Sequence, residues 1–232
     1  MTLSGKDLQK KNAGYKAGEY IKDGMTLGLG TGSTAYYAIL KAGELVKEGY
    51  KLEAVATSNE TARIARENGI EVLDLNDVEH IDLAIDGVDE IDGAFNAIKG
   101  GGGALFREKI VATLADEVIW IMDEGKPVDA IGEFPLPVEI LVYGHKHTLK
   151  ELADLGLNPV LRERDGKTFV TDNGNYIADL NLSAPLDIEN VAKKLAGVVG
   201  ILETGLFLNL CNRTVIGTED GAKVIENPNK KN

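Results

Sequence analysis

The sequence contains very little of several residue types that define special classes of protein. Its 232 residues include one cysteine, Cys211, one tryptophan and six prolines. A single cysteine excludes an internal disulfide framework and a cysteine-rich zinc site. We therefore expect Cys211 to be a small buried hydrophobic residue rather than a nucleophile.

The sequence also lacks an excess of basic over acidic residues, and it lacks long apolar segments. Lysine and arginine number 25 against 37 aspartates and glutamates, which gives a formal net charge of −12. Such a chain, without a block of basic residues, repels nucleic acid and anionic membranes. No apolar run approaches the ~20 residues of a membrane span, and the first residues show no apolar segment typical of a secretory signal. We therefore expect a cytoplasmic protein that binds neither nucleic acid nor membrane.

The first 130 residues show an alternation of apolar strands and helices. The pattern predicts helices at 7–23, 33–45, 58–68 and 105–115, and strands at 25–30, 52–56, 70–73, 81–85 and 118–122. Strands that are apolar throughout and separated by helices indicate a parallel sheet covered on both faces. Segments 214–217 and 222–225 are expected to return to this sheet. The fold class is thus α/β, with a Rossmann-like, doubly wound, mostly parallel sheet in a domain of residues 1–130 plus 206–232.

A different pattern begins at the proline-marked segment 133–137. It predicts strand 138–143, helix 147–155, strands 158–163, 167–172 and 175–180, helix 187–195 and strand 198–204. Asn173-Gly174 predicts a two-residue hairpin turn between the second and third strands of the central group. Apart from one additional strand, the order is close to the β-α-β-β-α-β ferredoxin-like pattern. We therefore expect a smaller ferredoxin-like α+β domain at residues 131–205.

Polar segments follow four strands of the first domain. In a doubly wound sheet, ligands bind beyond the carboxyl ends of the strands. The segments at these ends are residues 31–34, 57–59, 86–89 and 123–126. The topology therefore predicts a ligand site assembled from parts of the chain that are distant in sequence.

The segment Gly28–Thr34 is a glycine-rich turn from a strand into a helix. Backbone N–H groups at a helix start suit a phosphate, and the Ser33 and Thr34 hydroxyls add donors. The alternative is a tight turn in which Ser33 or Thr34 only caps the helix. The next strand is not followed by the acidic residue of an NAD site, and no Gly-Lys-Ser/Thr follows the loop. A small phosphorylated ligand is favoured.

Asp86 and Asp89 flank Gly87 and Val88 at the end of an apolar strand. Two carboxylates in a cleft suit proton transfer between hydroxyl groups. An aspartate-rich solvated turn explains the same spacing equally well, and a site for a hard cation explains it less well. The spacing alone leaves the catalytic and structural interpretations open.

Four consecutive glycines, Gly100 to Gly103, follow Lys99. Fixing four glycines in one conformation costs much conformational entropy. A fold that keeps them therefore needs backbone without side chains at that point. Lys99 then places a cation beside backbone N–H donors, which suits an anionic oxygen. A flexible linker is the alternative, but the segment lies inside a compact α/β alternation.

Glu108 belongs to the helix that follows the glycines, with Ala104 and Ala112 four residues away on either side. A carboxylate among small and apolar side chains suits a base that takes and returns a proton. The alternative is a surface glutamate that the helix dipole favours near the N-terminus. The three histidines, His80, His145 and His147, are too scattered for a metal triad, and we predict no metal site.

Together these motifs resemble the type A ribose-5-phosphate isomerase family. The matching segments are Gly30–Thr34, Asp86–Glu90, Lys99–Gly102, Arg107–Ile110, Phe134–Glu139 and Thr171–Asn175. The resemblance implies interconversion of ribose 5-phosphate and ribulose 5-phosphate through an enediolate, in the non-oxidative pentose phosphate pathway. It also implies that no metal or organic cofactor is used, and that the protein is a homo-oligomer, usually a dimer. Four glycines follow Lys99, where many members have three and then alanine.

The resemblance further implies roles for individual residues. Glu108 would move a proton between C1 and C2, and Asp86 and Asp89 would assist ring opening and hydroxyl proton transfer. Lys99 would supply a cation to the charged intermediate. The expected substrate contacts are Thr31, Gly32, Ser33, Thr34, Asp86, Gly87, Val88, Asp89, Lys99, Gly100, Gly101, Gly102, Lys126 and Lys10.

Two other kinds of function compete with this interpretation. A non-catalytic sugar-phosphate sensor on the same sheet would need a DNA-binding helical module, for which residues 1–24 are too short. An amino-sugar-phosphate isomerase/deaminase or a CoA transferase would carry its glutamates or histidines in different loops.

Overall fold

The computed structural model describes residues 3–230, so the two residues at each end of the expected first domain lie outside it. The chain forms two compact units. The first contains the residues up to Val88, Arg107–Lys126 and the residues from Asn209 onward; the second contains Asp89–Phe106 and Pro127–Leu208. Residues 89–106, which we expected in the first domain, are thus part of the second unit.

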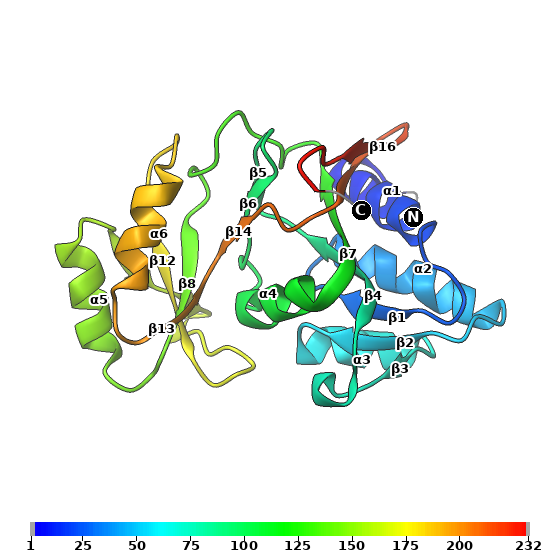
Figure 1. Ribbon diagram of the computed structural model, residues 1–232, viewed down its shortest axis with the longest axis horizontal. Helices are drawn as coiled ribbons and strands as arrows, with labels where there is room; N and C mark the ends of the chain where they lie inside the picture. The colour runs from blue at the N-terminus through cyan, green and yellow to red at the C-terminus, as the bar shows by residue number, and fades with distance from the viewer. Residues whose placement is uncertain (1–2, 231–232) are drawn as a thin grey trace. The chain divides into compact units, whose positions relative to one another are not determined.

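A seven-stranded sheet forms the centre of the first unit (Figure 1). Its strands are β1 (Thr26–Leu29), β2 (Glu53–Ala56), β3 (Glu71–Val72), β4 (Ile81–Gly87), β7 (Ala115–Asp123), β15 (Arg213–Thr218) and β16 (Gly221–Glu226). The order is β16-β15-β7-β4-β1-β2-β3, and only the β15–β16 pair is antiparallel. The predicted doubly wound, mostly parallel sheet is confirmed, including the return of the last two strands.

Helices cover both faces of this sheet. They are α1 (Gly5–Gly18), α2 (Ala35–Lys47), α3 (Asn59–Glu67) and α4 (Leu105–Leu114), and a short 3₁₀ turn spans Leu75–Asp77. Leu27 and Leu29 share one buried cluster with apolar residues of α1 and α2. Gly28 lies between them and faces the other way, and a Cβ there would lie 2.5 Å from Val111 Cγ1 of α4. The alternation of side chains along β1 therefore assigns α1 and α2 to one face and α4 to the other.

A four-stranded sheet forms the centre of the second unit (Figure 1). Its elements, in chain order, are β8 (Leu136–Ile140), α5 (His145–Asp154), β9 (Pro159–Leu161), β12 (Tyr176–Leu180), α6 (Ile188–Ala196) and β13 (Ile201–Thr204). The strand order is β13-β8-β12-β9, with every pair antiparallel. This is the ferredoxin-like arrangement that the sequence pattern predicts.

The predicted hairpin around Asn173-Gly174 is wrong in its details. Strand β11 (Lys167–Thr168) pairs with β10 (Glu163–Arg164), whereas β12 pairs with β8 and β9. Residues 172–174 form a three-residue loop, in which Thr171 N–H donates to Asn175 O at 2.8 Å and Gly174 has φ +80°. The reason is the buried Glu139, whose Oε1 accepts hydrogen bonds from the side chains of Thr171, Asn173 and Asn175.

A third sheet consists of β5 (Glu90–Ile91), β6 (Asn96–Ile98) and β14 (Leu206–Leu208), in the order β14-β6-β5. Sequence periodicity does not predict these strands because two or three residues are too few to show an alternation. Their pairing places residues 89–106 in the second unit. Within residues 3–230, no helix has both the length and the apolar character needed to cross a membrane.

Cys211 is fully buried in the first unit, as expected. Burial raises the pKa of its thiol to about 12. At pH 8 only about one thiol in ten thousand is then ionised, compared with roughly a quarter for an exposed cysteine.

We expect the native protein to resist alkylation by iodoacetamide at pH 8 and to react promptly in denaturant. Reaction at both stages can be followed by the mass increase of the intact chain. Prompt labelling of the folded protein would contradict the buried, protonated thiol. The same measurement on a Cys211→Ala variant, which has no cysteine, gives the background.

Candidate active site

The strand order of the first unit reverses between β1 and β4. The chain proceeds from β1 to β2 and β3 on one side, and from β4 to β7 and β15 on the other. A crevice for ligands is expected outside the carboxyl ends of the strands at such a switch point. Thr31 to Thr34 follow β1, and Asp86 and Gly87 end β4, followed by the buried Val88. The topology therefore brings these candidate residues of the first unit to one place.

Asp86 connects the ends of these two strands. Its Oδ1 accepts hydrogen bonds from the backbone N–H of Thr31 at 3.1 Å and of Gly87 at 2.7 Å. A Cβ at Gly30 would collide with the Asp86 carboxylate, so that glycine allows the close approach. Asp86 is 4% exposed. The interpretation of Asp86 as part of a solvated turn is therefore wrong.

Hydroxyl groups of threonines that follow the neighbouring strand β2 form hydrogen bonds with the turn after β1. Thr31 Oγ1 lies 2.7 Å from Thr57 Oγ1, and Thr61 Oγ1 donates to Gly30 O at 2.9 Å. Thr57 follows β2 and was predicted to lie at this edge, whereas Thr61 lies inside α3 and was not. Its only signal in the sequence is its position one turn after Ser58, the residue that caps α3.

The loop leading into α2 keeps the features expected of an anion site. Thr34 occupies the cap position of α2 without a capping hydrogen bond from its side chain. Gly32 and Ser33 are exposed. The cap interpretation thus does not explain these residues. The N–H groups of Tyr36 and Tyr37 donate to Gly32 O and Thr34 O, so the first turn of α2 offers an anion chiefly the positive end of the helix dipole.

Glu108 lies in the first turn of α4 and is 4% exposed. Val111, one turn later, packs against Gly28 in β1, at the level where Ala84 of the neighbouring β4 also lies close to Gly28. Helices that connect parallel strands run opposite to them, so one turn back along α4 leads toward the carboxyl ends of β1 and β4. Glu108 is therefore buried on the sheet side of α4, near the edge that holds Asp86, and is not a surface glutamate.

Lys126 and Lys10 lie at the neighbouring strand end. Lys126 follows β7, which is adjacent to β4 in the sheet. Helix α1 is attached to the same turn, since Gln9 Nε2 donates to Glu124 Oε2 at 2.9 Å and Gln9 Oε1 accepts from Glu124 N–H at 3.3 Å. Lys10 Nζ lies 3.9 Å from Asp7 Oδ1 near the start of that helix. Both lysines thus add positive charge near the carboxyl edge of the first unit.

The glycine run belongs to the second unit and has a defined conformation. Gly100 and Gly103 have φ of +104° and +86°, which side chains rarely adopt, and Gly103 N–H donates to Gly100 O at 2.9 Å. A Cβ at Gly103 would collide with the ring of Phe169. The linker alternative is therefore wrong. The fourth glycine, at which the sequence departs from many family members, lies against an aromatic ring.

Lys99 is almost completely buried, with 2% of its surface exposed. Its Nζ lies 5.3 Å from the centroid of the Phe207 ring, and its backbone N–H donates to Gly205 O at 3.0 Å. Cations are stabilised over aromatic faces, so this contact suits an ammonium group out of bulk water. The sequence predicts the cation but not its aromatic neighbour, which lies in β14.

Asp89 also belongs to the second unit, and its carboxylate is hydrogen-bonded to the glycine run. Its Oδ2 accepts a hydrogen bond from Gly101 N–H at 2.8 Å. Asp86 and Asp89, which the sequence suggests as a pair, thus hold two different segments. Gly102, the next residue after Gly101, is exposed.

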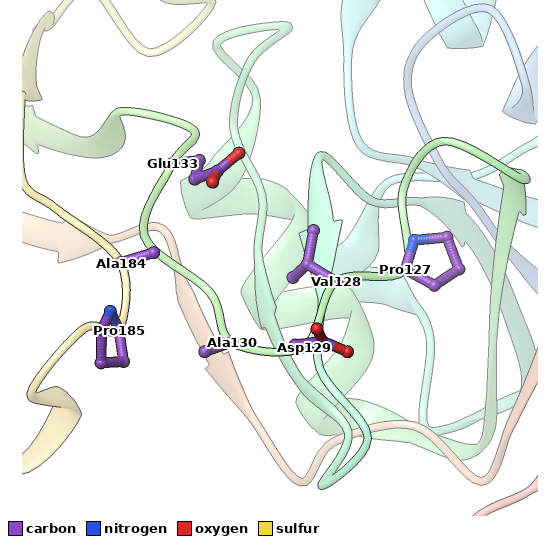
Figure 2. Close-up of a pocket in the computed structure, with 7 residues that line it drawn as sticks. All are labelled: Pro127, Val128, Asp129, Ala130, Glu133, Ala184 and Pro185. Atoms are coloured by element: carbon purple, nitrogen blue, oxygen red, sulfur yellow. The ribbon is translucent and has the colours of Figure 1, made fainter.

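A separate pocket of about 580 Å³ lies in the second unit (Figure 2). It is lined by Pro127, Val128, Asp129, Ala130, Glu133, Ala184 and Pro185. The lining contains two carboxylates and no cation, which disfavours a phosphorylated ligand. None of the candidate residues contributes to it, so we do not assign the sugar phosphate to this pocket.

The histidines do not join the candidate residues either. His145 and His147 lie in α5 of the second unit. His80 Nε2 lies 3.3 Å from Asp82 Oδ1, and Asp116 is close to both. These three groups lie at the amino ends of β4 and β7, which is the opposite edge of the sheet from Asp86.

This chain is similar to known proteins over nearly its whole length. Residues 53–221 match the profile of the family described as ribose 5-phosphate isomerase A (phosphoriboisomerase A). A ribose-5-phosphate isomerase A of Bifidobacterium longum subsp. infantis is 44% identical over 99% of this chain and 100% of its own length. The chain belongs to the ribose 5-phosphate isomerase A family. Another member, from Limosilactobacillus reuteri, is 48% identical over 93% of this chain and 96% of its own length.

Solved structures of family members share the fold. A ribose 5-phosphate isomerase of Plasmodium falciparum has a TM-score of 0.91 and 36% identity, covering 97% of this chain and 100% of that one. A D-ribose-5-phosphate isomerase in complex with phospho-erythronic acid has a TM-score of 0.90 and 35% identity, covering 96% and 100%. The resemblance seen in the sequence motifs is thereby confirmed at the level of family and fold.

Proposed function

We propose that this protein is a ribose-5-phosphate isomerase, which interconverts the aldose ribose 5-phosphate and the ketose ribulose 5-phosphate in the pentose phosphate pathway. The observation that carries the proposal is the burial of Glu108 near the carboxyl edge of β1 and β4. That edge also carries a helix N-terminus suited to a phosphate. The family membership supports the choice of substrate.

The phosphate is assigned to the loop Thr31–Thr34 with Lys126 and Lys10. The start of α2 carries the positive end of the helix dipole, which favours a phosphate beside it. The two lysines supply full positive charges near the same edge. Anchoring the phosphate fixes the far end of the sugar and so limits the positions that C1 and C2 can take.

Glu108 is the proposed base. In the open-chain aldose, it takes the proton from C2, and the electrons of that C–H bond form the C1–C2 double bond of an enediolate. The same carboxyl then returns the proton to C1, while the proton of the O2 hydroxyl moves to O1, which completes the ketose. Burial keeps the proton from exchanging rapidly with bulk water.

Negative charge develops on O1 during this transfer. Lys99 and the backbone N–H groups of the glycine run are the proposed donors to that oxygen. Asp86 and Asp89 are proposed to move protons between hydroxyl groups, including the one that opens the furanose ring. These donors supply the stabilisation from the protein itself, so the proposed reaction uses no metal and no organic cofactor.

The proposal is tested by incubating the protein with ribose 5-phosphate in D₂O and excess EDTA. We expect ribulose 5-phosphate to form, with deuterium from the solvent at C1, because a base that holds the proton exchanges it with water in part of the turnovers. Nuclear magnetic resonance at C1 and C2 gives both the rate and the isotope content. Glucosamine 6-phosphate in a parallel reaction tests the deaminase alternative.

Turnover that vanishes with EDTA would contradict the metal-free mechanism. Burial slows this exchange without abolishing it, so label accumulates over repeated reversible turnovers. Product without solvent deuterium after many such turnovers would contradict proton transfer through an enediolate. Release of ammonia from glucosamine 6-phosphate, with no reaction of ribose 5-phosphate, would overturn the proposed substrate. The homodimer that the resemblance implies and the cytoplasmic location expected from the composition stay predictions.

A further inference from the structure

Arg162 follows β9 in the second unit, and its side chain is 11% exposed. The guanidinium group donates through Nη1 to the carbonyl oxygens of Gly100 at 2.8 Å and Gly101 at 3.2 Å. A largely buried arginine thus contacts two successive carbonyls of the glycine run. No motif in the sequence indicates this contact, because 61 residues separate Arg162 from Gly101.

Asp179 of β12 fixes the guanidinium from the other side. Arg162 Nε donates to Asp179 Oδ2 at 2.8 Å, and Nη2 donates to Oδ1 of the same carboxylate. Strands β9 and β12 pair in antiparallel register, and Arg162 N–H donates to Ile177 O at 2.8 Å. A bidentate pair of this kind sets the orientation of the guanidinium plane as well as its position.

The peptide group between Gly100 and Gly101 is held at both ends. Its carbonyl oxygen accepts from Arg162, and its N–H donates to Asp89 Oδ2 at 2.8 Å. In a trans peptide the carbonyl and the N–H point in opposite directions. Arg162 and Asp89 therefore determine together how this peptide plane is turned, although glycine alone would allow many orientations.

The same geometry applies to the next peptide group. The Gly101 carbonyl points toward Arg162, so the N–H of Gly102, in the same peptide plane, points away from the guanidinium. Gly102 is exposed, whereas Arg162 is largely buried. The guanidinium thus orients one N–H donor of the glycine run away from the protein interior.

We propose that Arg162, held by Asp179, is a positioning residue that orients the Gly102 N–H as a fixed donor to the oxygen that becomes negative during isomerisation. The inference rests on the proposed function. A donor that is already oriented stabilises developing charge without reorganising at the moment of reaction, and removing one such donor typically lowers kcat by ~10²–10³-fold. Disordering a donor removes part of this effect, so a loss of ~30- to 100-fold is expected for Arg162.

The test replaces Arg162 by methionine, whose unbranched side chain fills the space of the arginine stem but is shorter and cannot donate a hydrogen bond. Arg164→Met is the matched control, since Arg164 stacks on Phe169 at 4.4 Å and has no hydrogen bond to the glycine run among the described residues. We expect Arg162→Met to lower kcat by ~30- to 100-fold with KM changed less than about threefold. Active sites are counted by titration with phospho-erythronic acid, so that loss of folded protein does not register as loss of kcat.

Two further variants keep the test decisive if Arg162→Met does not fold. Arg162→Lys can reach one carbonyl but cannot also make the bidentate pair, so its kcat should be intermediate. Asp179→Asn leaves the guanidinium in place with a weaker partner, and its kcat should fall less, by ~3- to 10-fold. A residue with a structural role alone would lower thermal stability and the number of titratable sites, with kcat per site unchanged.

The inference is overturned if kcat per site stays within threefold of wild type in the Arg162 variants that fold, while Lys99→Met loses activity in the same assay. If wild type itself does not convert ribose 5-phosphate, the proposed function fails instead. If Lys99→Met and the Arg162 variants all keep full activity, the glycine run has no part in catalysis and both assignments fail.

Discussion

Glu108→Gln should lower kcat for ribose 5-phosphate by ~10³–10⁴-fold, while the protein keeps its fold. Glutamine has the same shape as glutamate and can stay in the buried position on α4. An amide cannot accept a carbon-bound proton at neutral pH, so the step that forms the enediolate loses its base. Formation of ribulose 5-phosphate under saturating substrate measures the effect.

The matched control is Glu67→Gln, which changes an exposed carboxylate on α3 in the same unit. Its ion pair with Arg63 is exposed to solvent, and such surface pairs contribute little to stability, so both activity and stability should stay close to wild type. Glu108→Gln should keep the circular dichroism spectrum and the melting temperature of wild type, which shows that the fold survives. Near-normal turnover in Glu108→Gln would refute its assignment as the base.

The sequence was sufficient to predict those parts of the fold that depend on local pattern. Strands β1, β4 and β7 are apolar over several residues, and helices separate them, so both their type and the parallel sheet follow from periodicity. The short strand β6 pairs with β14, more than 100 residues later in the chain. Such pairing depends on tertiary contacts that a local pattern does not contain, which is why residues 89–106 were expected in the other unit.

The same distinction applies to the candidate site. Asp86, Lys99 and Glu108 could be selected because their residue types follow strands, glycines or small side chains in a way that suits proton transfer. Thr61 and Arg162 could not be selected from the sequence. Each donates a hydrogen bond to a backbone carbonyl of a glycine segment that is distant in sequence. The sequence therefore indicates the groups that we propose to contact the substrate better than the groups that hold backbone segments in place.

The second large effect is expected for Lys99→Met, which removes the ammonium and keeps a side chain of similar length over the Phe207 ring. A buried cation acts on developing charge in a medium of low dielectric, where it is worth much more than in water. We expect kcat to fall by ~10²–10³-fold and KM to change little, because the charge on O1 exists in the transition state and not in the bound aldose.

Whether the Lys99→Met substitution lowers kcat or raises KM decides the role of Lys99. A lysine that only anchored the phosphate would stabilise substrate and transition state equally, and its removal would raise KM with kcat unchanged. Lys126→Met provides that comparison, since Lys126 is assigned to the phosphate and should raise KM more than it lowers kcat. If Lys99→Met behaves like Lys126→Met, the cation belongs to substrate binding, and the glycine run must stabilise the enediolate through its N–H groups alone.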